Sequence, residues 1–233
     1  MEQLGVKVVV IECELGNFHL ELKKYISNKT KLVIVSGVSN VTGEESNIEE
    51  IGKICSENNL LFLVDGAQAS GHINIDLKNF NVDMFAFAGH KGLLSITGVG
   101  GLIVKDIKIL RPLIYGGTGS FSEDLIQPSQ TEEDFEAGTI SSIPIISLGA
   151  GVSFLEKNFS KIIEKEEKLS KKLYFELKKL PFLEIYSKPN SKNVFSFNIN
   201  DVDSSTVANL LNEKYNIAVR SGLHCAPLIH KKL

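Results

Sequence analysis

LLFLVDGAQ, residues 60–68, is the stretch of sequence that decides the fold. Residues 60–64 form an apolar run without polar alternation, which is typical of a parallel strand buried on both faces. Asp65 follows at the C-terminal end of this run, and open α/β sheets bind their ligands at that end of the strands. The stretch therefore predicts a buried strand that delivers a carboxylate to a sheet edge. A second interpretation makes Asp65 the cap of a following helix.

Strand-like and amphipathic segments alternate on both sides of this stretch. We expect strands at residues 7–11, 32–36, 60–64, 84–88 and 100–104, and helices at 19–26 and 47–58. Ser46 and Asn47 can cap the second helix, and Glu49 and Glu50 place negative charge in its first turn, where it suits the helix dipole. The alternation predicts an α/β fold with a mainly parallel sheet and helices on its faces.

The pattern changes after residue 107. A glycine-rich stretch at 116–120 and an acidic one at 131–136 lie in a long connection without a clear period. Helical periodicity returns over 145–180, with apolar residues on one stripe and lysines and glutamates elsewhere. Beyond it we expect a strand, a helix and a strand at 193–199, 204–215 and 217–220. This part predicts a small C-terminal α/β domain.

Composition excludes several classes of protein. Lys+Arg 25 against Asp+Glu 28 gives a net charge of −3, so no long-range positive field is available to hold nucleic acid. No run approaches the ~20 apolar residues of a membrane span. The apolar stretch at residues 8–11 is too short for a signal peptide. We expect a cytoplasmic protein that binds neither nucleic acid nor membrane.

The three cysteines, Cys13, Cys55 and Cys225, are far apart in the sequence and form no Cys-x-x-Cys pair. They predict free thiols in a reducing compartment rather than a disulfide framework. Cys55 falls on the apolar face of the helix at 47–58 and is interpreted as a small buried hydrophobe. Cys225 follows a strand-like run in a glycine-containing loop, where a reactive thiol is the alternative to burial.

The surroundings of Cys225 favour the reactive interpretation. Arg220 and His224 are close in sequence and would stabilise its thiolate. A metal site formed by His224, Cys225 and His230 would lack a fourth ligand at the usual spacing, so we expect no metal.

Lys91 comes directly after another apolar strand, between Gly89-His90 and Gly92, and 26 positions after Asp65. That spacing fits one βαβ unit, which would bring both side chains to one sheet edge. An amine and a carboxylate are the groups that pyridoxal phosphate needs, the first to hold its aldehyde and the second to keep its ring nitrogen protonated. The plainer interpretation of Lys91 is a solvated surface charge.

Taken together, five blocks in order resemble the class V aminotransferase fold group, and within it the cysteine desulfurase and selenocysteine lyase-like family. The blocks lie at residues 39–43, 65–68, 89–91, 135–139 and 220–226, and the similarity runs from about residue 31 to the C-terminus. The resemblance implies an aspartate-aminotransferase-like α/β fold (fold type I). Residues 1–150 would be the C-terminal portion of the large PLP-binding domain, and 151–233 an interdomain helix with an incomplete small domain.

The resemblance also implies a site for pyridoxal 5'-phosphate. Lys91 would hold the cofactor as an aldimine and move the substrate's α-proton, while His90 would contact the phosphate. Asp65 would pair with the ring nitrogen, and Gln68 and Asn40 would lie near the ring oxygen. The remaining cofactor residue is Thr139, which would reach the phosphate of a neighbouring subunit, so a homodimer is expected.

The activity implied is conversion of L-cysteine to L-alanine, with sulfur transferred to Cys225 as a persulfide. Asn40 and Arg220 would bind the substrate, which is L-cysteine or selenocysteine, and a sulfur-acceptor protein would be a partner. Two alternatives stay open: another class V aminotransferase or lyase, including selenocysteine lyase, in which Cys225 is incidental, and a truncated non-catalytic remnant.

Some residues depart from the family pattern. Ala88 stands where a hydroxyl residue is usual, Gly37 replaces a frequent histidine, and residues 95–98 replace a Gly-Pro-containing turn. Relative to the family, the chain begins within the large domain and stops soon after Cys225. The resemblance is therefore to a fragment of a longer enzyme.

Overall fold

The computed structural model describes residues 3, 5–117, 123, 132–188, 192 and 194–233. They form two compact units. The first, called the sheet unit here, comprises Ile26–Val35 and Ile48–Lys157. The second, called the Cys225 unit, comprises Met1–Tyr25, Ser36–Asn47 and Asn158–Leu233. The domain division at residue 150 that the sequence suggests remains a prediction.

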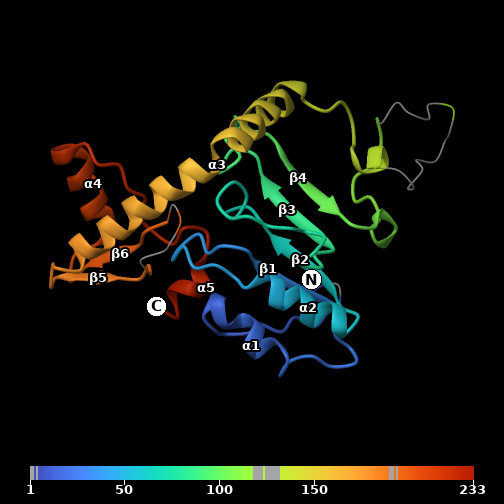
Figure 1. Cartoon of the computed structure of the whole chain (residues 1–233), viewed down its shortest axis with the longest axis horizontal. Helices are drawn as coiled ribbons and strands as arrows, with labels where there is room; N and C mark the ends of the chain where they lie inside the picture. Colours follow the sequence, from blue (N-terminus) through green and yellow to red (C-terminus); the bar gives the residue numbers. More distant parts are fainter. Residues whose placement is uncertain (1–2, 4, 118–122, 124–131, 189–191, 193) are drawn as a thin grey trace. The chain divides into compact units, whose positions relative to one another are not determined.

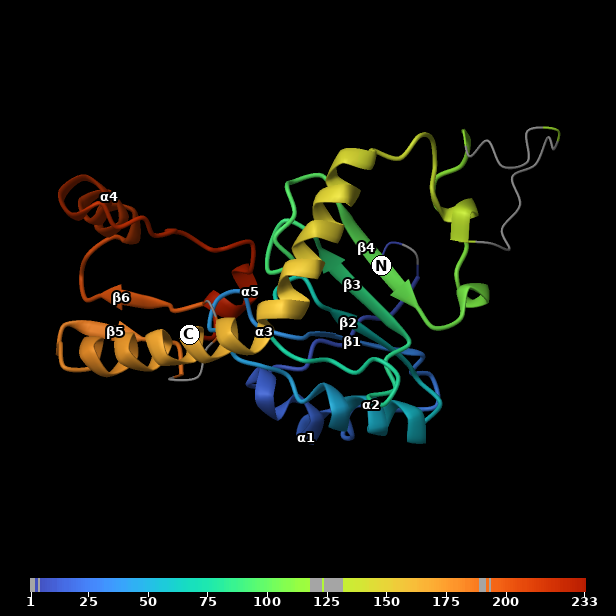
Figure 2. The same cartoon turned by 45° about the horizontal axis from the view of Figure 1, so that its top comes forward.

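A four-stranded sheet organises the sheet unit, with strand order β1 (Leu32–Ser36), β2 (Leu61–Asp65), β3 (Met84–Ala88) and β4 (Gly100–Val104) (Figure 1). β2 and β3 are parallel with Asp65 opposite Ala86, whereas β4 runs antiparallel to β3. Figure 2 shows α2 (Ile48–Glu57) below this sheet and the first turns of α3 (Ser142–Leu177) above it. The short helices η3 (Ile107–Ile109) and η4 (Glu132–Phe135) follow β4.

The core of the sheet unit lies between α2 and the sheet. Phe62 and Val64 on β2 and Ile51 on α2 are fully buried, and Cys55 on α2 is almost as inaccessible. Gly52 lets α2 approach the segment before β3, because a Cβ there would lie 1.8 Å from the carbonyl oxygen of Phe80. Burial of such side chains is the main source of stability in a domain of this kind.

Most predicted elements of the sheet unit are confirmed. The strands at 32–36, 84–88 and 100–104 have the predicted bounds, the helix expected at 47–58 is α2, and the strand expected at 60–64 is shifted by one residue. The prediction that this strand is buried on both faces is wrong, since Leu61 is 36% exposed. The apolar composition of this segment predicts the strand correctly, but it does not predict how completely the second face of the strand is covered.

The Cys225 unit contains short elements around the second part of α3. These are η2 (Leu15–Asn17), α1 (Phe18–Leu22), β5 (Leu183–Ile185), β6 (Phe197–Ile199), α4 (Ser204–Tyr215) and α5 (Pro227–His230). β5 and β6 pair antiparallel. Asp203 caps α4 by accepting hydrogen bonds from the backbone N–H groups of Ser205 and Thr206, and Asn216 ends the helix in a left-handed conformation.

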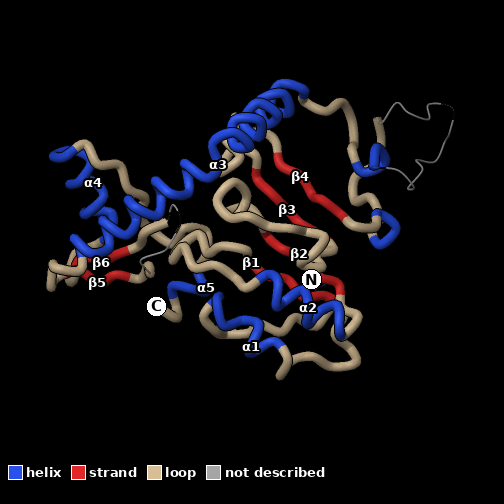
Figure 3. Tube along the Cα trace, in the orientation of Figure 1, coloured by secondary structure: helices blue, strands red, loops and turns tan. Residues whose placement is uncertain are grey.

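Several predictions in the Cys225 unit need correction. The helix at 204–215 has the predicted bounds, and that at 145–180 is α3, but the helix at 19–26 shortens to α1. Of the strand at 193–199 only β6 forms, and residue 193 lies outside the described residues. The prediction of a strand at 217–220 is wrong, because the chain between α4 and α5 has no strand (Figure 3).

The strand predicted at 7–11 is also wrong. Residues 6–12 are neither helix nor strand, and Val6, Val8, Val9 and Val10 are 45–62% exposed. Valine favours strands because it fits a pleated, half-buried surface, and that surface needs a neighbouring strand. None of the strands that the structure describes pairs with this segment. Within the described part of the chain, no helix is long and apolar enough to cross a membrane.

Candidate active site

The last residue of β2 is Asp65, which is exposed and whose Oδ1 accepts a hydrogen bond from the backbone N–H of Ala67, in the loop that follows, at 2.9 Å. Gly66 is buried against the ring of Phe85, and a Cβ at this position would lie 2.1 Å from that ring. The Gly66 carbonyl accepts both the N–H and the hydroxyl of Ser70, each at 2.8 Å. These contacts fix the direction in which the chain leaves the strand.

The loop after β3 carries the predicted cofactor lysine. His90 and Lys91 are both exposed, while Gly89 and Gly92 on either side are buried. The Gly89 N–H donates to Val99 O at 2.9 Å, and the Gly89 carbonyl accepts from Ser95 N at 2.9 Å. The base of this loop is therefore closed, and its two polar side chains face solvent.

Ser95 also anchors this loop to the start of α3. Its hydroxyl donates to the Pro144 carbonyl at 3.0 Å, and the Ser147 hydroxyl accepts from Ile96 N at 3.0 Å. Gly151 lies close to the loop as well, because a Cβ there would be 2.1 Å from Leu93 O. A packed helix thus limits the movement of the segment that carries Lys91.

The two loops touch each other. A Cβ on Gly71, which has φ +80°, would lie 2.3 Å from Gly92 O, and a Cβ on Gly92 would lie 2.1 Å from Ser70 O. The predicted juxtaposition of the Asp65 and Lys91 segments at one sheet edge is confirmed at the level of the backbone. Gln68, half-buried, lies in the first of these loops.

Sequence reasoning missed His72. Its Nε2 would be 2.7 Å from a Cβ on Gly92, so this imidazole lies beside the residue that follows Lys91. The available signal was the Gly71-His72 pair soon after the DGAQ stretch, because a glycine there allows the close approach of a second loop.

Thr139 lies in the exposed turn between η4 and α3. The Gly138 N–H donates to Gly116 O at 2.9 Å, and this bond holds the turn to the segment after β4. The proposed contact of Thr139 with a neighbouring subunit remains a prediction.

Asn40 extends from a tight turn in the Cys225 unit. The Ser39 hydroxyl accepts hydrogen bonds from the N–H groups of Val41 and Thr42, and Ser39 N donates to Glu44 O at 2.8 Å. Val41 is buried, whereas Asn40 is exposed. Its Nδ2 donates to the backbone carbonyl of His224 at 2.6 Å, across 184 residues of sequence.

Cys225 is an exposed free thiol. Nη2 of Arg220 lies 3.5 Å from its Sγ. Burial, the Arg220 guanidinium and His230 together lower the pKa of the His224 imidazole from its ordinary value. Among the described residues, no group of three His, Cys, Asp or Glu side chains could hold a metal ion.

The predicted site residues therefore fall into two sets. Those in the sheet unit are Asp65, Gln68, His90, Lys91 and Thr139, and those in the Cys225 unit are Asn40, Arg220 and Cys225. The roles assigned to them remain predictions.

Comparison with known proteins gives one family. The model of the class-V aminotransferase family matches residues 1–233. A probable cysteine desulfurase from Methanothermobacter thermautotrophicus is 34% identical over 97% of the chain and 58% of its own length. Another from Pyrococcus abyssi is 36% identical over 98% of the chain and 59% of its own length. The chain thus spans less than two thirds of the curated relatives it matches.

Solved structures agree with this result. The apo cysteine desulfurase from Thermococcus onnurineus NA1 superposes with a TM-score of 0.91 at 33% identity, covering 100% of this chain and 60% of that one. The cysteine desulfurase CsdA from Escherichia coli, an S-sulfonic acid form, gives 0.83 at 26% identity, covering 92% and 54%. The predicted aspartate-aminotransferase-like α/β fold (fold type I) is confirmed. The chain belongs to the class-V aminotransferase family.

Proposed function

We propose that this chain acts in a cysteine desulfurase that removes sulfur from L-cysteine with pyridoxal 5'-phosphate and receives it on Cys225. The observation that carries the proposal is the contact between the Asp65 and Lys91 loops through Gly71 and Gly92 at adjacent strand ends. The relatives named cysteine desulfurase support the choice of substrate.

The donor set of the sheet unit fits the cofactor. Lys91 offers an exposed amine, Asp65 an exposed carboxylate and His90 an exposed imidazole, all at or just beyond the C-terminal ends of two parallel strands. When bound, the cofactor supplies an electron sink for charge that develops on the substrate's α-carbon. His90 and Thr139 would hold the phosphate, and Thr139 would do so from a second subunit.

The remaining polar groups would orient the ring and the substrate. Asp65 would keep the ring nitrogen protonated, while Gln68 and Asn40 would hydrogen-bond the ring oxygen. Arg220 and Asn40 would bind the substrate, and the Lys91 amine would carry the α-proton.

The Cys225 thiolate would perform the sulfur transfer. Its sulfur forms an S–S bond with the substrate sulfur as the substrate's C–S bond breaks, and the bonding pair of that bond stays with carbon, which takes up a proton. L-cysteine and the Cys225 thiol thus become L-alanine and a Cys225 persulfide, and a thiol of an acceptor protein would remove the outer sulfur. Nη2 of Arg220 lies 3.5 Å from the Sγ atom that would receive the sulfur.

A homodimer is part of the proposal. Leu113 is 96% exposed, and Ile114, Ile143 and Ile146 are about 70% exposed, so the segments on either side of the Thr139 turn carry uncovered apolar side chains. Large exposed apolar residues are typical of protein–protein interfaces. We also place the protein in the cytoplasm, because its cysteines are free thiols of the kind that reducing compartments maintain.

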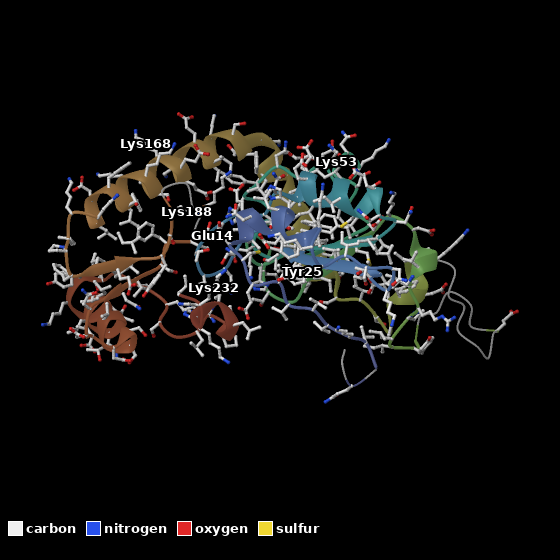
Figure 4. The ribbon with its side chains drawn as sticks, turned by 90° about the horizontal axis from the view of Figure 1, so that it is seen from below. Glu14, Tyr25, Lys53, Lys168, Lys188 and Lys232 are labelled. Atoms are coloured by element: carbon white, nitrogen blue, oxygen red, sulfur yellow. The ribbon has the colours of Figure 1, made fainter. Side chains whose placement is uncertain are left out.

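The test is the absorption spectrum of the purified chain with pyridoxal 5'-phosphate, before and after addition of L-cysteine. We expect a bound-cofactor band that Lys91→Ala abolishes and that cysteine changes. Lys53→Ala is the matched control, because Lys53 is an exposed lysine on α2 (Figure 4). A band that survives Lys91→Ala would contradict the assignment.

The second measurement is sulfide release by Cys225→Ala. We expect it to fall to background while the cofactor band stays. Release at the parental rate would instead support another class V lyase in which Cys225 is incidental.

A further inference from the structure

Hydrogen bonds and ion pairs join the turn at residues 36–47 to the C-terminal part of the Cys225 unit. The Ser196 hydroxyl donates to the Val41 carbonyl. Lys188 Nζ lies 3.1 Å from a Glu44 carboxylate oxygen, and Lys192 Nζ lies 3.4 Å from Glu45. The Asn40 bond to His224 O is therefore one of a set of contacts that hold the two segments together.

The loop that carries Cys225 has an unfavourable backbone conformation. His224 has φ 51° and Cys225 has φ 61°, so two successive residues with side chains occupy the left-handed region. Such residues stay in that region only when the surroundings hold them there. Within the loop, Ala226 N donates to Leu223 O at 2.9 Å, which closes the turn without holding the His224 carbonyl.

Asn40 is a well-placed donor for that carbonyl. The turn that carries it is rigid, since Val38 and Val41 are buried and the Ser39 hydroxyl accepts two backbone N–H groups. The His224 carbonyl belongs to the peptide unit whose nitrogen is that of Cys225. Holding this carbonyl therefore fixes the plane from which φ of Cys225 is measured, and with it the direction of the thiol.

We propose that Asn40 is a positioning residue for the loop that carries Cys225: its amide holds the His224 carbonyl and thereby keeps the Cys225 thiol beside Arg220. The proposal rests on the proposed function of Cys225 and adds a task to Asn40 that is separate from any contact with cofactor or substrate.

The test uses the chain without cofactor or substrate, so that cofactor binding by Asn40 cannot affect the result. The alkylation of Cys225 by iodoacetamide is followed over time at pH 7, and mass spectrometry of the modified peptide gives this alkylation profile. Arg220 contacts the Sγ atom of Cys225, His224 is adjacent in sequence, and the ring centroid of His230 is 5.7 Å from that of His224.

Asn40→Ala and Asn40→Leu should both slow alkylation at pH 7 by about threefold or more, because the freed loop carries the thiol away from the guanidinium. Asn40→Leu keeps the bulk of the side chain and removes the donor. Ser196→Ala is the matched control: it removes another contact of the same turn and should keep the parental profile.

An unchanged profile in Asn40→Ala would overturn the proposal. So would a parental profile in Asn40→Leu, since packing rather than the hydrogen bond would then hold the loop, or an equal shift in Ser196→Ala, since any loosening of the turn would then suffice. Failure of the proposed desulfurase activity is separate, because it would appear in sulfide release and leave the alkylation profiles as expected.

Discussion

Cys55 in the sheet unit and Cys225 in the other unit carry the same functional group in opposite surroundings. Cys55 is 1% exposed on α2, and burial together with the nearby Asp83 raises its pKa to about 12. Cys225 is exposed in a loop with left-handed backbone and has a guanidinium beside its sulfur. The difference shows that the fold, rather than the residue type, decides which thiol is available for chemistry.

The contrast extends to how each unit is held together. In the sheet unit, apolar side chains such as Phe62 and Val64 are fully buried. In the Cys225 unit, polar contacts join distant segments, and Figure 4 shows Glu14 and Lys188 close to each other, with Lys188 Nζ 3.3 Å from Glu14. Exposed ion pairs of this kind contribute about 0–1 kcal/mol each, so the unit depends on several of them.

The largest effect should come from the core of the sheet unit. Phe62→Ala should lower the free energy of unfolding by about 3–5 kcal/mol, because it leaves a cavity where a fully buried ring was. Urea denaturation followed by circular dichroism measures it. Val207→Ala on α4 is the comparison, since Val207 is one of the few buried apolar residues of the other unit. Equal losses in the two variants would remove the contrast between the units.

The thiols should differ strongly in reactivity. Relative to an ordinary thiol with a pKa near 8.5, the Cys55 thiol should react on the order of 1000-fold more slowly at neutral pH, because so little thiolate is present. Cys13, whose pKa is raised mainly by burial, should react at an intermediate rate. The exposed Cys225 should react fastest. Timed alkylation with peptide mapping measures the order. Modification of Cys55 as fast as Cys225 would show that α2 opens readily.

A smaller effect is expected at the cap of α4. Asp203→Ala removes the acceptor for two backbone N–H groups and should lower the Tm by about 2–4 °C. Glu213→Ala, an exposed acidic residue within the same helix, is the control and should leave the Tm almost unchanged. The same shift in both variants would point to lost charge rather than a lost cap.

The smallest effect is the pH dependence from His224. Its pKa is lowered in the folded chain, so below pH 6.5 the unfolded chain takes up a proton that the folded chain does not. Stability should therefore fall slightly as the pH drops from 6.5 towards the folded pKa. Denaturation midpoints at several pH values, compared with those of His224→Gln, measure this contribution. An unchanged slope in the variant would rule out His224 as its source.

Local pattern was sufficient where neighbouring residues decide the structure. The strand at 84–88 and the helix at 204–215 were predicted with the observed bounds, because apolar runs and capping residues are local signals. The strands at 7–11 and 217–220 failed, since β-branched composition is local but strand pairing is not. Part of the site could also be predicted. The spacing between Asp65 and Lys91 fits adjacent strands, so both were expected at one edge of the sheet. The Asn40 bond to His224 joins residues 184 apart and has no local signal.

The exposed valine segment at residues 6–10 has a practical consequence for work with this chain. Together with Ile11 it forms a six-residue window of strong strand formers interrupted by a single charge, Lys7. Windows of this kind pair with copies of themselves when they are uncovered and concentrated, and they seed cross-β aggregates. The rate of aggregation in storage should therefore rise with protein concentration, and Val9→Lys should lower it without replacing any of the three cysteines.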